Sequence, residues 1–134
     1  MLEKLNHIAI VVPDLKKAIA NYKNGLHAKI SKVMPLPNHG VSTAFIELSN
    51  TNIELLEPLG EKSPISNFLN RNINGGIHHI CYEVIDIKRS ISELKKKNYN
   101  LIGEGIPRIG AHGKPVVFIH PKEFNGTLIE LEEI

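Results

Sequence analysis

One segment of the chain occurs twice, and this repeat limits the possible folds more than any other feature. Residues 6–30 and residues 78–102 align without a gap at a shift of 72. Eight of the 25 aligned positions are identical, whereas ordinary residue frequencies give roughly one or two by chance. The identical pairs are His7/His79, Ile8/Ile80, Val12/Val84, Asp14/Asp86, Lys16/Lys88, Ile19/Ile91, Lys23/Lys95 and Ile30/Ile102. The repeat predicts a duplicated structural module.

Each copy opens with an alternating strand and continues as an amphipathic helix. Asp14 and Asp86 are expected to cap the N-termini of the two helices, and Asn24-Gly25 is expected to end the first one. The apolar strand faces should pack against these helices, which leaves His7 and His79 on the opposite faces. The apolar faces are Ile8/Ile10/Val12 and Ile80/Tyr82/Val84.

Three further strand-like segments follow in each copy, so each module is expected to have the order β-α-β-β-β. Between the modules we expect a short helix that is capped by Ser63 and has Pro64 in its first turn. We predict an α+β fold in a single domain, residues 1–134, with module one (1–59), a connecting segment (60–76) and module two (77–134). The expected strand segments are 28–36, 40–50 and 51–58 in the first copy, and 101–108, 114–121 and 127–134 in the second.

The repeat isolates one histidine and one glutamate in each module, since the final strands align Glu54 with Glu130. Together with His7 and His79 they offer two imidazoles and two carboxylates, a set that suits a divalent Co, Ni, Mn, Fe or Zn ion. A structural interpretation stays open, because such residues are also common as hydrogen-bonded or solvated groups, and duplication alone can preserve them. His78 has no histidine counterpart in the first copy. It is expected on the opposite face, either as a packing residue or as a support for the ligands.

Composition excludes several other classes of protein. The chain has 134 residues, of which 42% are hydrophobic and 22% charged, as in ordinary globular proteins. A net charge of +2 argues against a nucleic-acid partner, and no apolar run is long enough to span a membrane. The single cysteine, Cys81, favours a reducing compartment. We expect a cytoplasmic protein with neither a nucleic-acid nor a membrane partner.

Longer motifs carry a family resemblance that covers nearly the whole chain. The chain resembles the methylmalonyl-CoA epimerase family of the vicinal oxygen chelate superfamily in "LNHIAIVVPDL", "GVSTAFIELSNTNIELLEPLGEKSPISNFL", "GGIHHICYEVIDI" and "PVVFIHPKEFNGTLIELEE". The resemblance implies a glyoxalase-like fold, in which the duplicated modules form a curved, mostly antiparallel sheet around a metal cleft. It also implies that His7, His79 and Glu130 are metal ligands and that Glu54 is the fourth, where some members have Gln.

The activity implied by the resemblance is metal-dependent epimerisation of (R)- and (S)-methylmalonyl-CoA, by α-proton abstraction through a metal-stabilised enolate. Glu130 is the first candidate for the base, and Glu54 would face it across the metal. Some members carry a further carboxylate where this chain has Thr43, which cannot act as a base at neutral pH. The alternatives for the second base are Glu47, Glu54 and a bound water.

The same resemblance implies an acyl-CoA substrate and a homodimer. A glycine-rich, basic loop is predicted to contact the substrate, although an ordinary hairpin connection fits that loop equally well. Its candidate contact residues are Arg108, His112 and Lys114.

Two other functions fit the same residues. A glyoxalase I (lactoylglutathione lyase) type of isomerase uses this fold and, in many bacterial forms, the same four ligands, so only the surrounding motifs favour the epimerase. A non-catalytic binding or resistance protein of this fold is the second alternative. Such proteins often line their cleft with aromatic side chains, and only 5% of this chain is aromatic.

Overall fold

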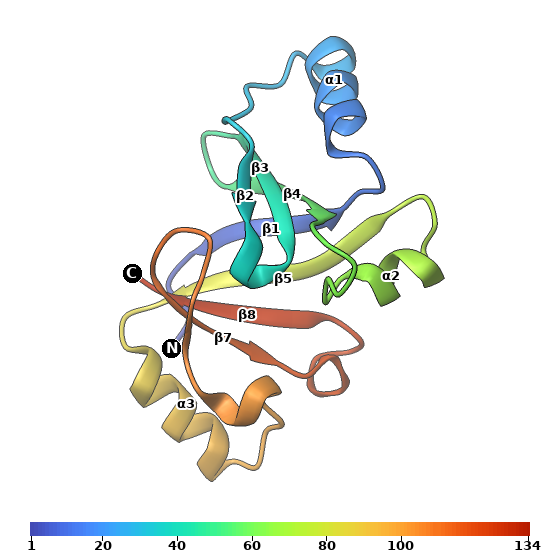
Figure 1. Ribbon diagram of the computed structural model, residues 1–134. Helices are drawn as coiled ribbons and strands as arrows, with labels where there is room; N and C mark the ends of the chain where they lie inside the picture. The colour runs from blue at the N-terminus through green and yellow to red at the C-terminus, as the bar shows by residue number, and fades with distance from the viewer. The chain divides into compact units, whose positions relative to one another are not determined.

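The computed structural model describes residues 1–134 and contains eight strands, three α-helices and three 3-10 helices (Figure 1). The strands are β1 (Leu5–Val11), β2 (Met34–Leu36), β3 (Val41–Glu47), β4 (Asn52–Pro58), β5 (Gly76–Val84), β6 (Arg108–Ile109), β7 (Pro115–Ile119) and β8 (Leu128–Glu133). The α-helices are α1 (Leu15–Leu26), α2 (Ser66–Arg71) and α3 (Ile87–Lys96). The 3-10 helices are η1 (Pro37–His39), η2 (Ile102–Gly105) and η3 (Pro121–Glu123).

Helices α1 and α3 begin at the residues that the repeat predicts. The Asp14 carboxylate accepts the backbone N–H of Lys17 at 2.9 Å, and the Asp86 carboxylate accepts that of Arg89 at 2.9 Å. Each bond satisfies a first-turn N–H that has no partner within its helix. Both predicted N-caps are confirmed.

Each of these helices also forms a hydrogen bond with the last strand of its own module, and the two bonds occupy matched positions. The backbone N–H of Leu15 donates to Glu57 at 2.6 Å, and that of Ile87 donates to Glu133 at 2.9 Å. Glu57 lies near the end of β4 and Glu133 ends β8. A carboxylate at a helix N-terminus is also favoured by the helix dipole. The duplication therefore extends to the contacts between helix and strand.

Two of the predicted helix ends are wrong. Helix α1 continues through Asn24-Gly25 to Leu26, and His27 caps it in the left-handed conformation with φ 53°. Helix α2 begins only at Ser66, without a side-chain cap. The backbone carbonyl of Ser63, not its hydroxyl, accepts the N–H of Ser66 at 3.2 Å. The buried Ser63 hydroxyl has no hydrogen-bond partner.

Two of the predicted strand segments are largely irregular. In the first copy only Met34–Leu36 of segment 28–36 forms a strand. In the second copy half of segment 101–108 forms η2, where Gly103, Glu104 and Gly105 have φ values of 65°, 61° and 67°. A β-strand requires negative φ, so these residues cannot continue one.

The chain divides into two compact units. Unit 1 comprises Met1–His7 and His79–Ile134, and unit 2 comprises Ile8–His78. Both boundaries fall inside strands, so β1 and β5 contribute residues to each unit. This division follows compactness, whereas the modules predicted from the repeat follow sequence similarity, and the module boundaries stay a prediction.

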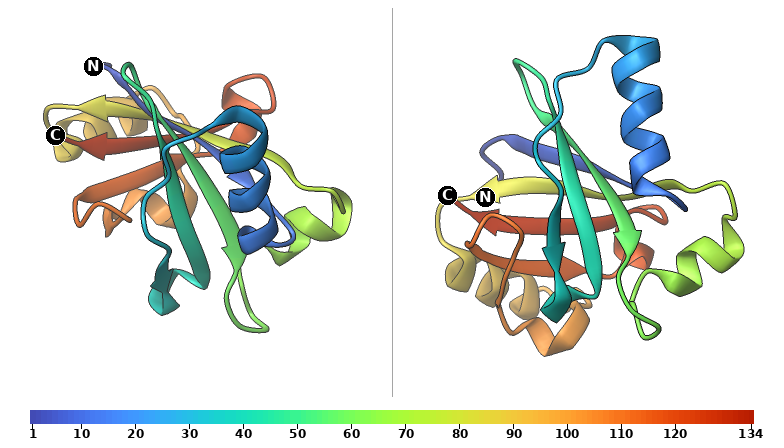
Figure 2. Two further views of the ribbon diagram at one scale, coloured as in Figure 1. Left: turned by 90° about the horizontal axis from the view of Figure 1, so that it is seen from above. Right: turned by 45° about the horizontal axis from the view of Figure 1, so that its top comes forward.

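Within unit 1 the strand order is β1-β5-β8-β7-β6. Strand β8 pairs parallel with β5 and antiparallel with β7, which pairs antiparallel with β6. Helix α3 lies along β7 and β8 (Figures 1 and 2). Ile80 and Tyr82 of β5 pack on this core, as predicted. The core consists of Val84, Ile87, Ile91, Leu94, Val117, Ile119, Ile129 and Leu131.

Within unit 2 the strand order is β2-β3-β4-β1, with β2, β3 and β4 antiparallel to one another. Helix α1 packs against β3 and β4. Ile10 and Val12 join its core, so the strand face predicted to meet α1 does so. A second cluster in this unit contains Ala9, Val11, Val41, Leu56 and Ile65.

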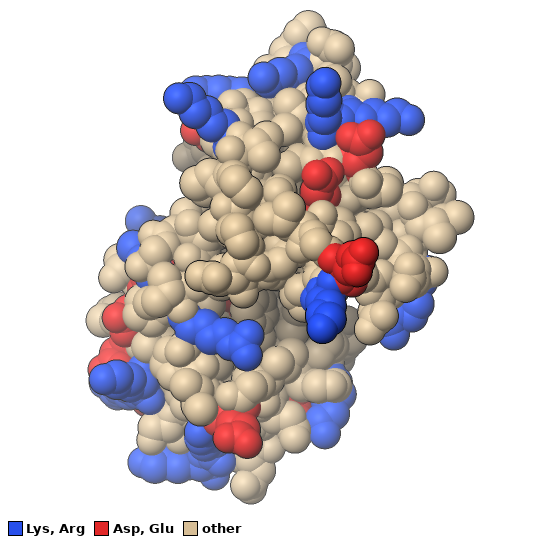
Figure 3. Space-filling view, viewed as in Figure 1, with Lys and Arg blue, Asp and Glu red and all other residues tan.

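The surface carries charges of both signs. On the face shown in Figure 3, basic and acidic side chains are interspersed, in keeping with the net charge of +2. None of the helices has the length and apolar character needed to cross a membrane.

Candidate metal centre

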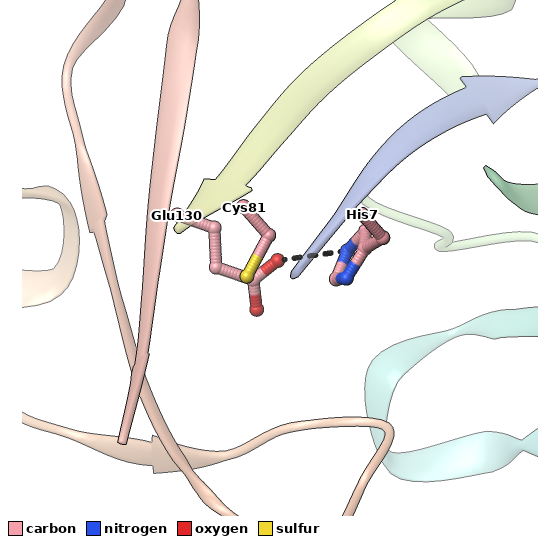
Figure 4. A group of neighbouring side chains, drawn as sticks. All are labelled: His7, Cys81 and Glu130. Carbon is pink, nitrogen blue, oxygen red and sulfur yellow. Dashed lines mark ion pairs between the residues drawn. The ribbon is translucent and has the colours of Figure 1, made fainter. Parts of the chain in front are cut away.

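Three predicted ligands converge inside unit 1. His7 comes from β1, His79 from β5 and Glu130 from β8, and their exposed fractions are only 2%, 5% and 6%. The Nε2 atoms of the two histidines are 3.2 Å apart. Oε2 of Glu130 lies 3.0 Å from Nε2 of His79 and 3.4 Å from Nε2 of His7. Figure 4 shows the His7 and Glu130 side chains directed toward one another.

The hydrogen bond made by Nδ1 of His7 determines which of the two ring nitrogens carries the hydrogen. Nδ1 of His7 lies 2.7 Å from Oδ1 of Asn6. An amide oxygen can only accept, so Nδ1 carries the hydrogen and Nε2 carries the lone pair. The Nε2 lone pair of His7 and the oxygen of Glu130 therefore face the same small space.

The protonation state of Glu130 follows from its neighbours. Burial raises the pKa of Glu130, but its interactions with the imidazoles of His7 and His79 outweigh burial and bring the pKa down to about 2. The side chain is therefore an anion at neutral pH. Two imidazole nitrogens beside a buried carboxylate form a donor set that fits a divalent transition-metal ion.

Cys81 also lies at this cluster, although the repeat does not mark it as a site residue. It is fully buried, and its Sγ lies within 4.8 Å of ligand atoms of His7 and Glu130 (Figure 4). Cys81 pairs with Glu130 in the parallel ladder. Strand alternation was the available signal, since residue 81 lies on the same face as residue 79.

Glu54, the fourth predicted ligand, belongs to unit 2. It is 4% exposed on β4 and accepts a hydrogen bond from the hydroxyl of Thr43, which is on the adjacent strand β3, at 2.9 Å. Thr43 therefore acts as a donor to a carboxylate, in agreement with the expectation that it is not a base. A metal-binding role for Glu54 stays a prediction.

The three predicted substrate contacts lie in unit 1 and differ in their surroundings. Nδ1 of His112 lies 3.1 and 3.0 Å from the two oxygens of Glu132, and its ring centroid is 5.9 Å from that of His7. Arg108, on β6, and Lys114 are exposed. The structure thus brings His112, but neither cation, next to a candidate ligand, and all three substrate contacts stay predictions.

Two residues near the cluster, Glu132 and Asn6, are not marked by the repeat. Glu132 is 3% exposed and contacts both His112 and Asn6. Asn6 escaped notice because its position in the repeat is occupied by His78. The His78 ring packs edge-on against Phe68, with centroids 5.1 Å apart, in agreement with its predicted packing role.

Comparison with known proteins relates these features to a family. The family model for the Glyoxalase/Bleomycin resistance protein/Dioxygenase superfamily matches residues 6–118. The ethylmalonyl-CoA/methylmalonyl-CoA epimerase of Cereibacter sphaeroides is 56% identical over 134 residues, which is 100% of this chain and 100% of the relative. The matched region therefore spans the whole chain.

Solved structures extend the similarity to the fold. A methylmalonyl-CoA epimerase from Mycobacterium tuberculosis has a TM-score of 0.89 at 31% identity, over 98% of this chain and 88% of its own. A methylmalonyl-CoA epimerase in complex with methylmalonyl-CoA and NH4+ has a TM-score of 0.89 at 27% identity, over 99% and 95%. The predicted α+β, glyoxalase-like fold is confirmed. The chain belongs to the glyoxalase/bleomycin resistance protein/dioxygenase superfamily and, within it, to the methylmalonyl-CoA epimerases.

Proposed function

We propose that this protein is a metal-dependent epimerase that interconverts (R)- and (S)-methylmalonyl-CoA. The observation that carries the proposal is the buried cluster of His7, His79 and Glu130 in a chain of this family. One relative is named for ethylmalonyl-CoA and methylmalonyl-CoA, and one solved relative is in complex with methylmalonyl-CoA. The substrate class proposed for this chain is the same.

The proposed metal ligands are His7, His79, Glu130 and Glu54. The short distances among the first three support them, and Glu54 is supported by its burial and by its match to Glu130 in the repeat. The mixed nitrogen and oxygen donors suit Co, Ni, Mn, Fe or Zn. Such a cation supplies positive charge that stabilises the negative charge developing on substrate oxygens as the α-carbon loses its proton.

Glu130 is the proposed base for the α-proton. Its carboxylate is ionised at neutral pH because two imidazoles stabilise the charge. That same stabilisation makes it a weak base, so its contacts with His7 and His79 must loosen as the oxygen takes the proton. Inversion needs a second group on the other face of the carbon, and Glu54 is proposed for that role.

The acyl-CoA is proposed to contact His112, Arg108 and Lys114. His112 is held beside His7 by Glu132, and the two exposed cations suit the phosphates of CoA. We further propose a cytoplasmic homodimer without a nucleic-acid or membrane partner. Its one cysteine and small net charge support the reducing compartment and the lack of a nucleic-acid partner.

The test follows the α-hydrogen directly. The metal-replete protein is incubated with racemic methylmalonyl-CoA in heavy water, and deuterium at the α-carbon is measured by NMR against an enzyme-free sample. We expect rapid exchange in both enantiomers, loss of exchange after chelation, and recovery when Co²⁺ or Mn²⁺ is added. No exchange by the metal-replete protein, or turnover of the methylglyoxal–glutathione adduct instead, would contradict the proposal.

A further inference from the structure

We propose that Asn6 is a positioning residue that holds the His7 ring in the one tautomer able to bind a cation through Nε2, and that Glu83 and Glu132 hold Asn6 in turn. The inference rests on the proposed cation site. It assigns a role to three side chains of unit 1 that the repeat and the ligand set leave unexplained.

The orientation of the Asn6 amide is fixed by two carboxylates. Its Nδ2 lies 3.1 Å from Oε1 of Glu83 and 3.3 Å from Oε1 of Glu132. A carboxylate oxygen only accepts hydrogen bonds, so the amide nitrogen must face the two glutamates. The amide oxygen is consequently directed to His7, from which it accepts a hydrogen bond at 2.7 Å.

This orientation selects the His7 tautomer. With the hydrogen on Nδ1, the ring donates to Asn6 and directs a lone pair from Nε2 toward Glu130 and His79. With the hydrogen on Nε2, two lone pairs would face each other across 2.7 Å at Asn6. The second arrangement loses a partly buried hydrogen bond, and it places a hydrogen on Nε2 in place of the lone pair that a metal requires.

Glu132 connects this support to the loop that precedes β7. Its side chain is 4% exposed and also accepts from Nδ1 of His112, at 3.0 Å to Oε2. One buried carboxylate therefore contacts both Asn6 and the residue proposed to meet the substrate. Burying a carboxylate that accepts two hydrogen bonds costs much less free energy than burying one that accepts a single hydrogen bond.

The arrangement is specific to the first histidine. The position that corresponds to Asn6 in the second copy is His78, and its ring packs against Phe68. His79 is therefore preceded by an imidazole that packs on an aromatic ring, whereas His7 is preceded by an amide whose oxygen contacts its Nδ1. The amide that contacts His7 is therefore not repeated at the matched position of the second copy.

The test uses Asn6→Ala, with Asn100→Ala as the matched control. Asn100 is an exposed asparagine of the same unit whose amide donates to Glu123, away from His7. Calorimetric titration with Mn²⁺ or Co²⁺ measures cation affinity. We expect Asn6→Ala to bind about 10- to 100-fold more weakly than wild type, as is typical when a group that orients a ligand is removed, and Asn100→Ala to bind as wild type does.

A second measurement does not use the Asn6→Ala variant. The ¹⁵N shifts of the His7 ring in the cation-free wild type, assigned by comparison with His7→Gln, report which nitrogen carries the hydrogen. We expect the Nδ1–H form. An Nε2–H form, or equal cation affinity in Asn6→Ala and Asn100→Ala, overturns the inference. A wild-type protein that binds no divalent cation ends the proposed function, while the ring shifts still decide the role of Asn6.

Discussion

The hydroxyl of Thr43 donates a hydrogen bond to Oε1 of Glu54 across 2.9 Å, and both side chains are buried in unit 2. Thr43→Val keeps the shape of the side chain and removes the donor, which leaves a buried carboxylate with one partner fewer. We expect a loss of about 1–3 kcal/mol in the free energy of unfolding. Urea unfolding of the cation-free protein measures it, and Thr127→Val serves as a control outside this pair. An unchanged midpoint in Thr43→Val would show that the bond contributes nothing.

Replacing Glu130 with glutamine removes the charge and the proposed base while nearly preserving the volume of the side chain. Exchange of the α-hydrogen of methylmalonyl-CoA should fall by roughly 10²- to 10⁴-fold, measured at saturating cation so that weaker metal binding does not contribute. Glu93→Gln, a change at an exposed α3 residue paired with Arg89, should exchange at the wild-type rate. Full exchange in Glu130→Gln would remove this residue from the reaction.

The stability of the cation-free protein should depend on pH through Glu130. The folded-state pKa of Glu130 is about 2, against an ordinary value of 4.5 for a glutamate side chain. The unfolded chain therefore takes up a proton at a higher pH than the folded one, so the stabilisation is complete above about pH 4.5 and is lost as pH falls toward 2. It amounts to roughly 3 kcal/mol. The difference in unfolding free energy between wild type and Glu130→Gln should shrink over this interval, and a constant difference would contradict the low pKa.

The two matched N-caps should make similar contributions to the free energy of unfolding. Asp14→Ala and Asp86→Ala each remove a cap at an exposed helix start, and each should lower the unfolding free energy by about 1 kcal/mol. Asp14→Asn and Asp86→Asn should restore most of it, because the asparagine oxygen can accept the same N–H. The double alanine variant should lose the sum, since the two sites share no partner. A much larger combined loss in denaturant unfolding would mean that the caps are coupled.

Local signals in the sequence predicted the parts of the fold that local interactions determine. Asp14 and Asp86 were recognisable as caps because each bonds an N–H three residues away. Segment 101–108 was mispredicted because its apolar residues suggested a strand. Gly103 and Gly105 were the signal for the positive φ values that end it, and the apolar pattern outweighed them.

The candidate site was predicted only where the repeat marks it. Comparison of the copies separated His79 from His78, and the structure brings His79 to His7 and Glu130. The same comparison passed over Asn6, because the copies differ there. Its partners Glu83 and Glu132 are 77 and 126 residues away, and no periodicity in a single sequence reports contacts at such separations.

Unit 1 consists of two separate stretches of the chain, and this limits the order in which the two units can fold during translation. Unit 2 is one continuous stretch, Ile8–His78, and is synthesised before any residue of the second part of unit 1. Nascent chains fold as their segments emerge from the ribosome, so unit 2 can become compact early. His7 precedes unit 2 in the chain and Glu130 follows it, so the cluster of His7, His79 and Glu130 can assemble only after unit 2 has been synthesised.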